Sequence, residues 1–406
     1  MVPNGWFTYK FSEIVKETQL GTTERHKGEF CSDPIPLLKM GNLSWGGFNL
    51  KSLETLPRSR VDESLILKKG DFLFNTRNTP ELVGKSAVWN GELTEAIFDN
   101  NINRIVFHNS IDPFYLGLYL NNGRGKSVIN SLPAGSTSVA AIYWKDLKNI
   151  KLTLPPLPEQ RKIAKILSTW DKAVATTEKL IATSQQQKKA LMQQLLTGKK
   201  RLLDDSGKPF EGEWEWLKAS ELFKTVSKKN NSDSEELLSV TQDQGVLPRK
   251  ILERRVVMPD GSTKGYKLVV PGNFIISLRS FQGGLEYSRY RGLVSPAYTV
   301  LEPVKPINNE FYKQYYKSYN FIGHLAVAVI GIRDGKQISY SDFSFLKLPY
   351  PKVKEQQKIA AVLTNADKEI ELLQAKLAHL KDEKKALMQQ LLTGKRRVKV
   401  DENVAA

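Results

Sequence analysis

The sequence has almost no cysteine and little histidine. Cys31 is the only cysteine among 406 residues, and the four histidines are scattered at positions 26, 108, 324 and 379. An internal disulfide framework and a multi-cysteine zinc site are therefore excluded, and no metal cluster at ligand spacing is present. No apolar run reaches the ~18 residues of a membrane span, and the amino-terminal MVPNGWFTYK lacks the apolar core of a signal peptide. We therefore expect a cytoplasmic protein with no membrane partner.

Catalytic motifs are also missing. The string GRGKS at 123–127 resembles a phosphate-binding loop, but Leu120 stands where Walker A requires glycine. IDPFY at 111–115 resembles the D-P-P-[FY] corner of amino-methyltransferases, yet one proline is missing and no glycine-rich cofactor motif accompanies it. The scattered carboxylates of Glu95, Asp99 and Asp112 have no partner at a defined spacing, which is typical of a solvated face. These absences predict a non-catalytic chain that holds no cofactor and no metal.

Positive charge, in contrast, is abundant. Lys and Arg number 60 against 43 Asp and Glu, which gives a net charge of +17 and a pI near 9.6. A soluble protein this basic usually has a polyanionic partner, and nucleic acid is the first candidate. The alternative is a basic protein whose charge serves only solubility.

One twelve-residue string occurs twice. KKALMQQLLTGK stands at 188–199 and again at 384–395, an offset of 196 residues that is nearly half of the chain. Upstream residues recur in the same register: Glu159 as Glu355, Gln160 as Gln356 and Ile163 as Ile359. Self-similarity at this distance marks an internal duplication. We therefore expect two half-proteins in tandem.

The repeated segments are predicted to be long helices. Apolar positions step by four and three residues, which is typical of a coiled-coil seam over about five heptads. Proline precedes each helix, an acidic residue lies in its first turn, and each helix ends at Thr-Gly, with Gly198 and Gly394 suited to a left-handed cap. A helix of roughly 39 residues is ~58 Å long at 1.5 Å per residue. The apolar seam residues are Ile163, Leu167, Trp170, Val174, Ile181, Leu191 and Leu195 in the first copy, and Ile359, Leu363, Ile370, Leu373, Leu377, Leu380, Leu387 and Leu391 in the second.

The two seams are unlike, because the first is polar at Thr177 and Ser184. We therefore expect the helices to pair with each other rather than with their own copies. Since the first helix leads from one globular segment to the other, such a pair would be antiparallel and would act as a rigid spacer. The alternative is that each stripe belongs to an ordinary helix buried on a domain core.

The segments between the helices, 1–157 and 200–354, carry short β-rich runs such as GDFLFNTR and NFIISLR, punctuated by Gly, Asn and Pro. They diverge on a shared frame, in which Trp6 aligns with Trp214. The predicted fold class is α+β: two mixed α/β domains joined by two long antiparallel helices that form a coiled coil, with a pseudo-twofold internal duplication. Constant helices with varied domains indicate one kind of task performed on two targets.

Candidate DNA-contacting residues lie in the predicted turns of both domains. Arg, Lys, Asn and Gln carry the donors and acceptors that read guanine and adenine edges, and neighbouring Lys and Tyr suit phosphate contacts. For any single one of them, an ordinary solvated loop side chain is the alternative. The candidates are Lys39, Asn42, Trp45, Asn75, Arg77, Asn78 and Lys85 in the first domain, and Arg279, Gln282, Tyr287, Arg289 and Arg291 in the second.

Two duplicated strings carry a resemblance to a known family. LPPLPEQRKIAKIL at 154–167 and PKVKEQQKIAAVL at 351–363, each followed by KKALMQQLLTGK, resemble the DNA specificity subunit of type I restriction-modification systems. GDFLFNTRNTPELVGK at 70–85 resembles the strand-and-turn segment of that family's target-recognition domains, and GNFIISLRS at 272–280 is a weaker match. The resemblance covers almost the whole chain. The tandem tetrapeptide repeat that some members carry at the helix ends is not present in this sequence.

The resemblance implies a domain plan and a set of partners. The plan is target-recognition domains at 1–157 and 200–354, conserved spacer helices at 158–199 and 355–397, and a tail at 398–406. Each domain would read one half of a bipartite site on double-stranded DNA. The helix pair would set the gap, dock two methyltransferase (modification) subunits and recruit the restriction (translocase) subunits. S-adenosylmethionine, ATP and Mg²⁺ would then be bound by those partners and not by this chain.

Two other classes of function compete with this interpretation. A restriction-methylation enzyme in one polypeptide would need a glycine-rich cofactor loop and an intact D/N-P-P-F/Y corner, and neither is here. A non-catalytic basic coiled-coil scaffold without sequence specificity would have little reason to diversify its ends. Sequence-specific footprints on DNA separate the specificity subunit from the scaffold.

Overall fold

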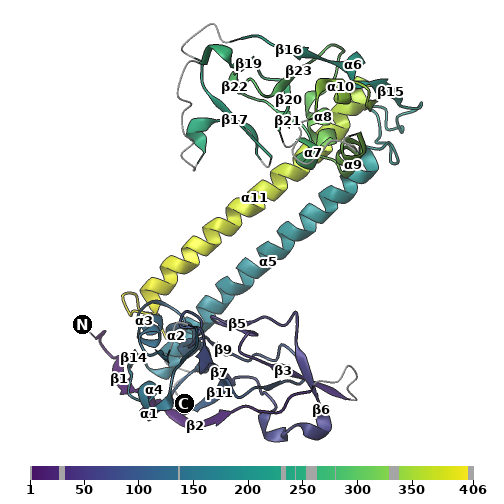
Figure 1. The fold of residues 1–406 in the computed structure, drawn as a ribbon. Coiled ribbons are helices and arrows are strands. Elements are labelled where there is room, and N and C mark those ends of the chain that lie inside the picture. The colour runs from purple at the N-terminus through teal and green to yellow at the C-terminus, as the bar shows by residue number, and fades with distance from the viewer. Residues whose placement is uncertain are drawn as a thin grey trace. The chain divides into compact units, whose positions relative to one another are not determined.

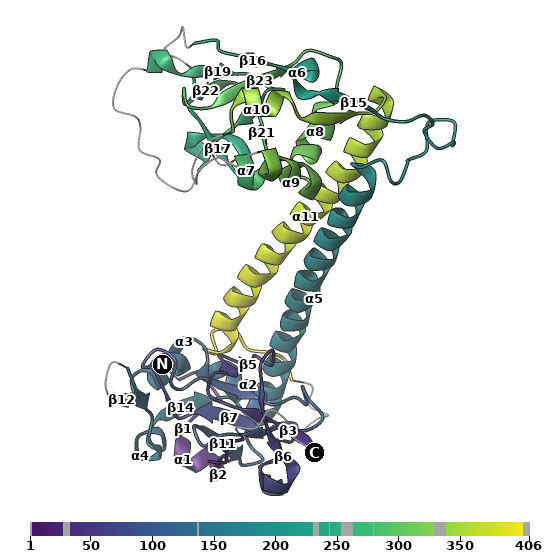
Figure 2. The ribbon, with the colours of Figure 1, turned by 45° about the vertical axis from the view of Figure 1, so that its right-hand side comes forward.

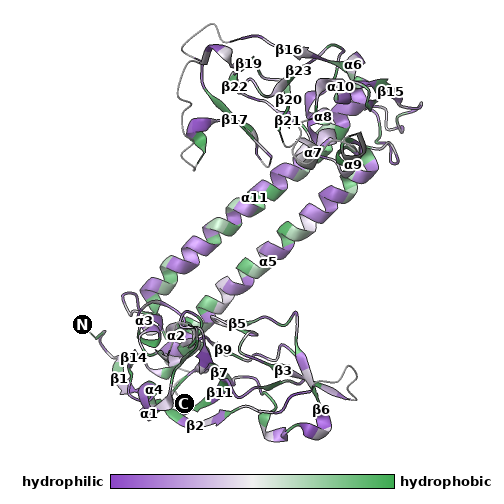
Figure 3. Ribbon diagram, viewed as in Figure 1, coloured by the Kyte–Doolittle hydropathy of each residue, from purple (hydrophilic) through white to green (hydrophobic). Residues whose placement is uncertain are grey.

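Two long helices begin where the proline-rich segments end. In the computed structural model, α5 (Leu157–Leu195) and α11 (Val353–Leu391) are each 39 residues long (Figure 1). Every apolar seam residue predicted from the sequence is buried or half-buried, whereas between residues 178 and 190 the positions off the seam are exposed. Figure 3 shows the corresponding recurrence of apolar positions along both helices. The predicted helix lengths are therefore confirmed.

The structure describes residues 2–26, 33–135, 138–229, 235–242, 244–252, 263–278, 280–328 and 338–400. These residues form two compact units, each made of one head and parts of both long helices. Unit 1 comprises Met1–Thr176 and Leu377–Ala406, and unit 2 comprises Thr177–Lys376. The predicted domain plan separates heads from helices, whereas the compact units divide both helices near their middle. Of the described helices, none is long and apolar enough to cross a membrane.

The head of unit 1 is a mixed α/β structure. Its elements are β1 (Phe7–Lys10), α1 (Phe11–Ile14), β2 (Val15–Leu20), β3 (Pro34–Leu38), β4 (Leu43–Ser44), β5 (Gly47–Phe48), β6 (Glu54–Pro57), β7 (Phe72–Asn75), β8 (Arg77–Asn78), β9 (Ser86–Val88), β10 (Ile97–Phe98), β11 (Ile102–Phe107), α2 (Pro113–Leu120), α3 (Gly123–Asn130), β12 (Ala134–Gly135), β13 (Ala140–Ala141), α4 (Trp144–Leu147) and β14 (Lys151–Leu154). The central sheet has the order β2-β11-β7-β9 and is antiparallel throughout. β1 pairs with β14, so the start of the head is tied to the strand that leads into α5.

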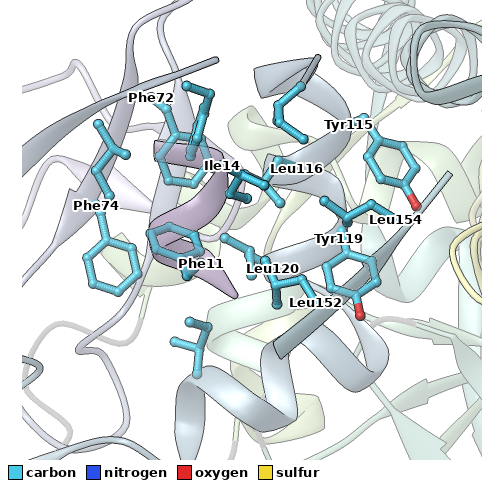
Figure 4. Close-up of a cluster of buried hydrophobic side chains, with 14 of the residues drawn as sticks. Phe11, Ile14, Phe72, Phe74, Tyr115, Leu116, Tyr119, Leu120, Leu152 and Leu154 are labelled. Atoms are coloured by element: carbon cyan, nitrogen blue, oxygen red, sulfur yellow. The ribbon is translucent and has the colours of Figure 1, made fainter. Parts of the chain in front are cut away.

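The core of unit 1 gathers residues from distant parts of the chain. Figure 4 shows it around α1, β7, α2 and β14, with labelled side chains Phe11, Ile14, Phe72, Phe74, Tyr115, Leu116, Tyr119, Leu120, Leu152 and Leu154. Ile163 and Leu167 from the start of α5 belong to the same core, as do Leu391 and Leu392 from the end of α11. Fully burying one such side chain contributes about 1.5–3 kcal/mol. Both helix ends therefore help to hold the head together.

The head of unit 2 repeats this plan. Its elements are β15 (Glu215–Lys218), α6 (Ala219–Leu222), β16 (Phe223–Val226), β17 (Leu238–Thr241), β18 (Gly245–Pro248), β19 (Lys267–Val269), β20 (Phe274–Ile276), α7 (Ser280–Gly283), β21 (Glu286–Tyr287), β22 (Gly292–Val294), β23 (Thr299–Pro303), α8 (Asn309–Tyr316), α9 (Tyr319–Ala328), α10 (Tyr340–Ser344) and β24 (Lys347–Tyr350). The sheet order β16-β23-β20-β21 corresponds to that of unit 1, and β15 pairs with β24 as β1 does with β14. Figure 2 shows β16 and β23, two neighbouring strands of this sheet, in the head of unit 2.

Small details of the frame are duplicated as well. The backbone N–H of Lys10 donates to the Glu13 carboxylate at 2.8 Å, and Lys218 donates to Glu221 at the same distance, so the same cap opens α1 and α6. The core of unit 2 again takes residues from both long helices, including Leu195 of α5 and Ile359 of α11. The fold class is therefore the predicted α+β duplication with two long helices.

Candidate nucleic-acid interface

The glutamine at the start of each long helix ties that helix to its head. In unit 1 the buried Gln160 donates through Nε2 to a proline carbonyl at 2.8 Å and accepts at Oε1 from the backbone N–H of Asp112 at 2.9 Å. In unit 2 Gln356 makes the same two bonds, to a proline carbonyl at 2.8 Å and from the N–H of Asn308 at 2.8 Å. Asp112 and Asn308 are the N-caps of α2 and α8. The duplicated glutamine therefore fixes the head's first major helix against the long helix.

The neighbouring glutamate is bound by an arginine that follows the other long helix. In unit 1 Arg397 Nε and Nη2 each donate to a Glu159 carboxylate oxygen at 2.7 Å. In unit 2 Arg201 Nε and Nη2 donate to Glu355 at 2.6 and 2.8 Å, and Trp214 Nε1 adds a bond of 3.1 Å. The Glu355 side chain has no exposed surface. A bidentate ion pair of this kind is geometrically specific. Each pair therefore holds the segment that follows one long helix in a fixed position against the start of the other.

A second duplicated ion pair lies between the long helices within each unit. Lys188 Nζ on α5 contacts Asp367 Oδ1 on α11 at 2.5 Å in unit 2. Lys384 on α11 contacts Asp171 on α5 in unit 1. Together with the arginine–glutamate pairs, these contacts join early residues of one helix to late residues of the other. The helix segments are therefore antiparallel within each unit.

Three of the predicted DNA-contacting residues lie around the β4–β5 hairpin of unit 1. Asn42 is used internally, because it accepts from the N–H of Lys39 at 2.9 Å and donates to the carbonyls of residues 49 and 52. Lys39 Nζ is paired with Glu54 at 2.6 Å. Trp45, at the hairpin tip, is half-buried, and Lys126 Nζ lies 4.0 Å from the centroid of its ring. Lys39 and Asn42 are therefore engaged with neighbouring groups of the same head, and Trp45 is partly open to solvent at the hairpin tip.

The segment that follows β7 contains the other four candidates of unit 1. Asn75 is fully buried, and its Nδ2 donates to the Arg77 carbonyl at 3.2 Å. Lys85 is also buried, and this burial lowers its pKa. Asn78 is half-buried, and its Oδ1 accepts from the next backbone N–H at 2.9 Å. Arg77 is exposed on β8. Asn75 and Lys85 therefore belong to the framework in this structure, and Arg77 is the residue that faces solvent.

The candidates of unit 2 lie around α7 and the β21–β22 turn. Arg279 is outside the described residues, and Gln282 lies on α7, where only the backbone is described. Tyr287 is half-buried against Phe274, with ring centroids 5.2 Å apart, and burial raises its pKa. Arg289 and Arg291 are exposed, and each is paired with a carboxylate. The structure therefore leaves these two arginines as the most accessible described candidates of unit 2.

Sequence reasoning missed two basic residues of unit 1. Arg124 is exposed and Lys126 half-buried in the first turn of α3, where Lys126 meets Trp45. Both belong to the GRGKS string, which the sequence suggested only as a failed nucleotide-binding loop. The only signal in the sequence was the pair of basic residues itself, because their approach to the half-buried Trp45 is a long-range contact; basic side chains of this kind suit phosphate contact. Among the described residues, no group of three His, Cys, Asp or Glu side chains is arranged to hold a metal ion.

Comparisons with known proteins agree with the duplicated architecture. A family model described as the type I restriction modification DNA specificity domain matches residues 58–184 and 211–382. The chain is 27% identical over 361 residues to the type I restriction enzyme MjaVIII specificity subunit of Methanocaldococcus jannaschii, covering 84% of this chain and 82% of that protein. It is 26% identical over 423 residues to a protein of the same organism with the provisional name of MjaX specificity subunit, covering 98% and 95%. The solved structure of a type I restriction-modification system S subunit from M. genitalium has a TM-score of 0.57 at 14% identity, covering 96% of this chain and 99% of that one.

Proposed function

Because the chain belongs to the type I restriction modification DNA specificity domain family, we propose that it reads a bipartite site on double-stranded DNA, one half with each unit. It is a specificity subunit, the role that the names of its relatives give to them, and specificity subunits of type I restriction systems are non-catalytic. The observation that carries the proposal is one head architecture built twice with different exposed polar residues. Arg77 faces solvent in unit 1, and Arg289 and Arg291 do so in unit 2.

The exposed arginines have the chemistry that this task needs. A guanidinium can bind the O6 and N7 atoms of guanine with two parallel hydrogen bonds, and it can equally neutralise a phosphate. Because the two heads present different residues on a common frame, each would recognise a different half-site. The net charge of +17 would add a sequence-independent attraction that weakens steeply with salt.

The repeated string at the helix ends supports the docking of one kind of partner twice. Among its identical residues, Lys189 and Gln193 in unit 2 are exposed, and so are Lys385 and Gln389 in unit 1. A surface offered twice in the same form suits two copies of one subunit, which we propose to be the methyltransferase (modification) subunits. The restriction (translocase) subunits would join the same complex, and the long helices would set the gap between the half-sites.

The chemistry of the complex would reside in those partners. S-adenosylmethionine, ATP and Mg²⁺ would be bound by the modification and restriction subunits, and the chain would act on DNA in the cytoplasm. This chain's part would be to orient the modification subunits on a chosen sequence. Binding energy is then used for positioning, since catalysis by the partner requires the target base at a defined place.

Methylome sequencing tests the proposal. A host that expresses the partner subunits should be sequenced by a single-molecule method with the chain, without it, and with Arg77→Ala. We expect a bipartite motif with a fixed gap that disappears on deletion, and a motif relaxed in one half only in the variant. If the methylome is the same with and without the chain, the proposal is overturned and a scaffold without sequence specificity becomes the better interpretation.

A further inference from the structure

The turn between β21 and β22 of unit 2 carries two arginines two residues apart. Arg289 and Arg291 flank Tyr290, and their side chains are 57% and 58% exposed. The turn is short and follows a strand of the central sheet, so its backbone is held from both sides. Two exposed guanidinium groups on one such turn are a concentrated set of donors for a polyanion.

Each of these guanidinium groups is already engaged by a carboxylate from a different element. Arg289 Nη2 donates to Glu310 Oε1 in the first turn of α8 at 2.6 Å. Arg291 donates through Nε at 3.0 Å and through Nη2 at 2.7 Å to Glu235 Oε1, just before β17. The Glu310 and Glu235 side chains are 28% and 18% exposed, so both are more buried than the arginines that they bind. The hydrogen bond that Arg289 donates to Glu310 also raises the pKa of Arg289.

Unit 1 exposes its arginine at another position of the shared frame, because Arg77 follows β7, which corresponds to β20 and not to β21. Arg77 is exposed, and within the described residues no carboxylate lies within 4.0 Å of its guanidinium. The two heads therefore present their arginines in different states. One arginine is available to an incoming anion, whereas the two of unit 2 must first leave a carboxylate.

We propose that Glu235 and Glu310 limit the DNA affinity of unit 2 by competing with DNA for Arg291 and Arg289. The inference rests on the proposed function and assigns residues that do not themselves touch the bases. A carboxylate and a phosphate offer the same kind of oxygen pair to a guanidinium, so the glutamates stand in for DNA while the site is empty. Random DNA gains a phosphate contact only by breaking an existing ion pair, and a matching half-site adds base-edge bonds that repay this loss.

The size of the effect follows from the exposure of the pairs. Breaking an exposed ion pair changes an equilibrium by roughly 1.5- to 5-fold. Each glutamate should therefore weaken non-specific binding by about that factor, and the two together by about their product. A structural role alone predicts the opposite direction, since loosening a turn that binds DNA lowers its affinity.

The test uses the full chain assembled with the modification subunits of its own system. Affinity for duplexes with and without the recognition site is measured for the wild type, Glu235→Gln and Glu310→Gln over a range of salt. Glu235→Gln is the cleaner variant, because Glu310 also contacts Lys313 at 3.3 Å. Glu302→Gln is the matched control: it removes one negative charge from the same head, where Glu302 lies 3.9 Å from an exposed lysine.

We expect Glu235→Gln to bind non-specific DNA about 1.5- to 5-fold more tightly than Glu302→Gln does, with a gain at least as large for the specific site, because both kinds of DNA compete with the same ion pair of the free protein. The slope of log affinity against log salt should steepen by about 0.9 for the arginine that is freed. In an Arg291→Gln background the gain should vanish. Affinity that is unchanged, weaker or equal to that of Glu302→Gln overturns the inference. If the wild-type complex shows no preference for any site, the proposed function itself fails, which the first measurement of the series reveals.

Discussion

Removing the guanidinium of Arg201 should destabilise unit 2 far more than removing an exposed charge. Glu355 is completely buried and is held by Arg201 at 2.6 and 2.8 Å. In Arg201→Met the carboxylate would keep only the Trp214 bond of 3.1 Å. Breaking a buried pair costs about 3–5 kcal/mol, and we expect the lower end of this range because Arg201 is 23% exposed and water can enter.

The measurement is hydrogen exchange of the core amides of unit 2, supported by urea denaturation of the full chain. The matched control is Lys224→Met, which breaks an exposed pair of 3.9 Å to Glu302 and should cost less than about 1 kcal/mol. A double variant, Arg201→Met with Glu355→Leu, should recover much of the loss because it leaves no buried charge. If Arg201→Met lowers the free energy of unfolding no more than Lys224→Met does, the buried Arg201–Glu355 pair does not stabilise unit 2 as argued.

Three further predictions concern the framework. Burial lowers the pKa of Lys85 below its usual 10.5, so the folded chain releases this proton before the unfolded chain does. The free energy of unfolding therefore rises as pH increases toward 10.5. Lys85→Met should raise the Tm at neutral pH and should remove this rise. Thermal melts between neutral pH and pH 10.5 test this, and a wild-type Tm that does not rise would contradict it. A β-carbon at Gly284, where φ is +77°, would lie 1.7 Å from the Tyr316 carbonyl oxygen, so Gly284→Ala should cost at least about 1–3 kcal/mol in urea denaturation. In contrast, Gly323→Ala meets open space within α9 and should be stabilising by up to about 1 kcal/mol; equal effects of the two would contradict this packing. Leu377→Pro in α11 should cost about 3 kcal/mol or more and abolish docking of the modification subunits, and normal assembly by size-exclusion chromatography would speak against the need for an intact helix.

The long helices were predictable because their signals are local. Gly198 and Gly394 adopt φ of +70° and +69° and end the helices where the Thr-Gly strings suggested. The sheets were predictable only as β-rich segments. β10 and β8 have two residues each and pair with strands far along the chain, and no short run of sequence encodes such pairing. The packing of Leu391 into the core of unit 1 is likewise a long-range contact that the local sequence does not predict.

The candidate site was predictable in residue type more than in exposure. Asn75 and Lys85 are polar residues near a turn, so solvent exposure was the natural expectation. Their segments pair instead, with the N–H of Asn75 donating to the Lys85 carbonyl at 2.8 Å, and both side chains are buried by the surrounding head. The Glu-Gln signature indicated a helix start, but its partners are long-range: Arg397 lies 238 residues from Glu159.

The contacts that join head to helix explain why the duplicated string stayed identical while the heads diverged. A β-carbon at Gly198 would lie 3.4 Å from the Trp214 ring, and one at Gly394 would lie 3.2 Å from the Trp6 ring. Each glycine therefore packs against the tryptophan that opens a head, and substitution at either meets both a positive φ and a ring. The contacts between head and helix also include the hydrogen bonds of Gln160 and Gln356 and the two arginine–glutamate pairs.

None of the exposed DNA-contacting candidates takes part in these contacts between head and helix. Arg77, Arg289 and Arg291 lie on β8 or on the β21–β22 turn, where their substitution leaves the tryptophan, glutamine and glutamate contacts intact. Surface substitutions away from such contacts usually change stability by no more than about 0.5 kcal/mol. Residues that face solvent can therefore change what each head recognises, while a small fixed set of buried contacts keeps each head on its helices.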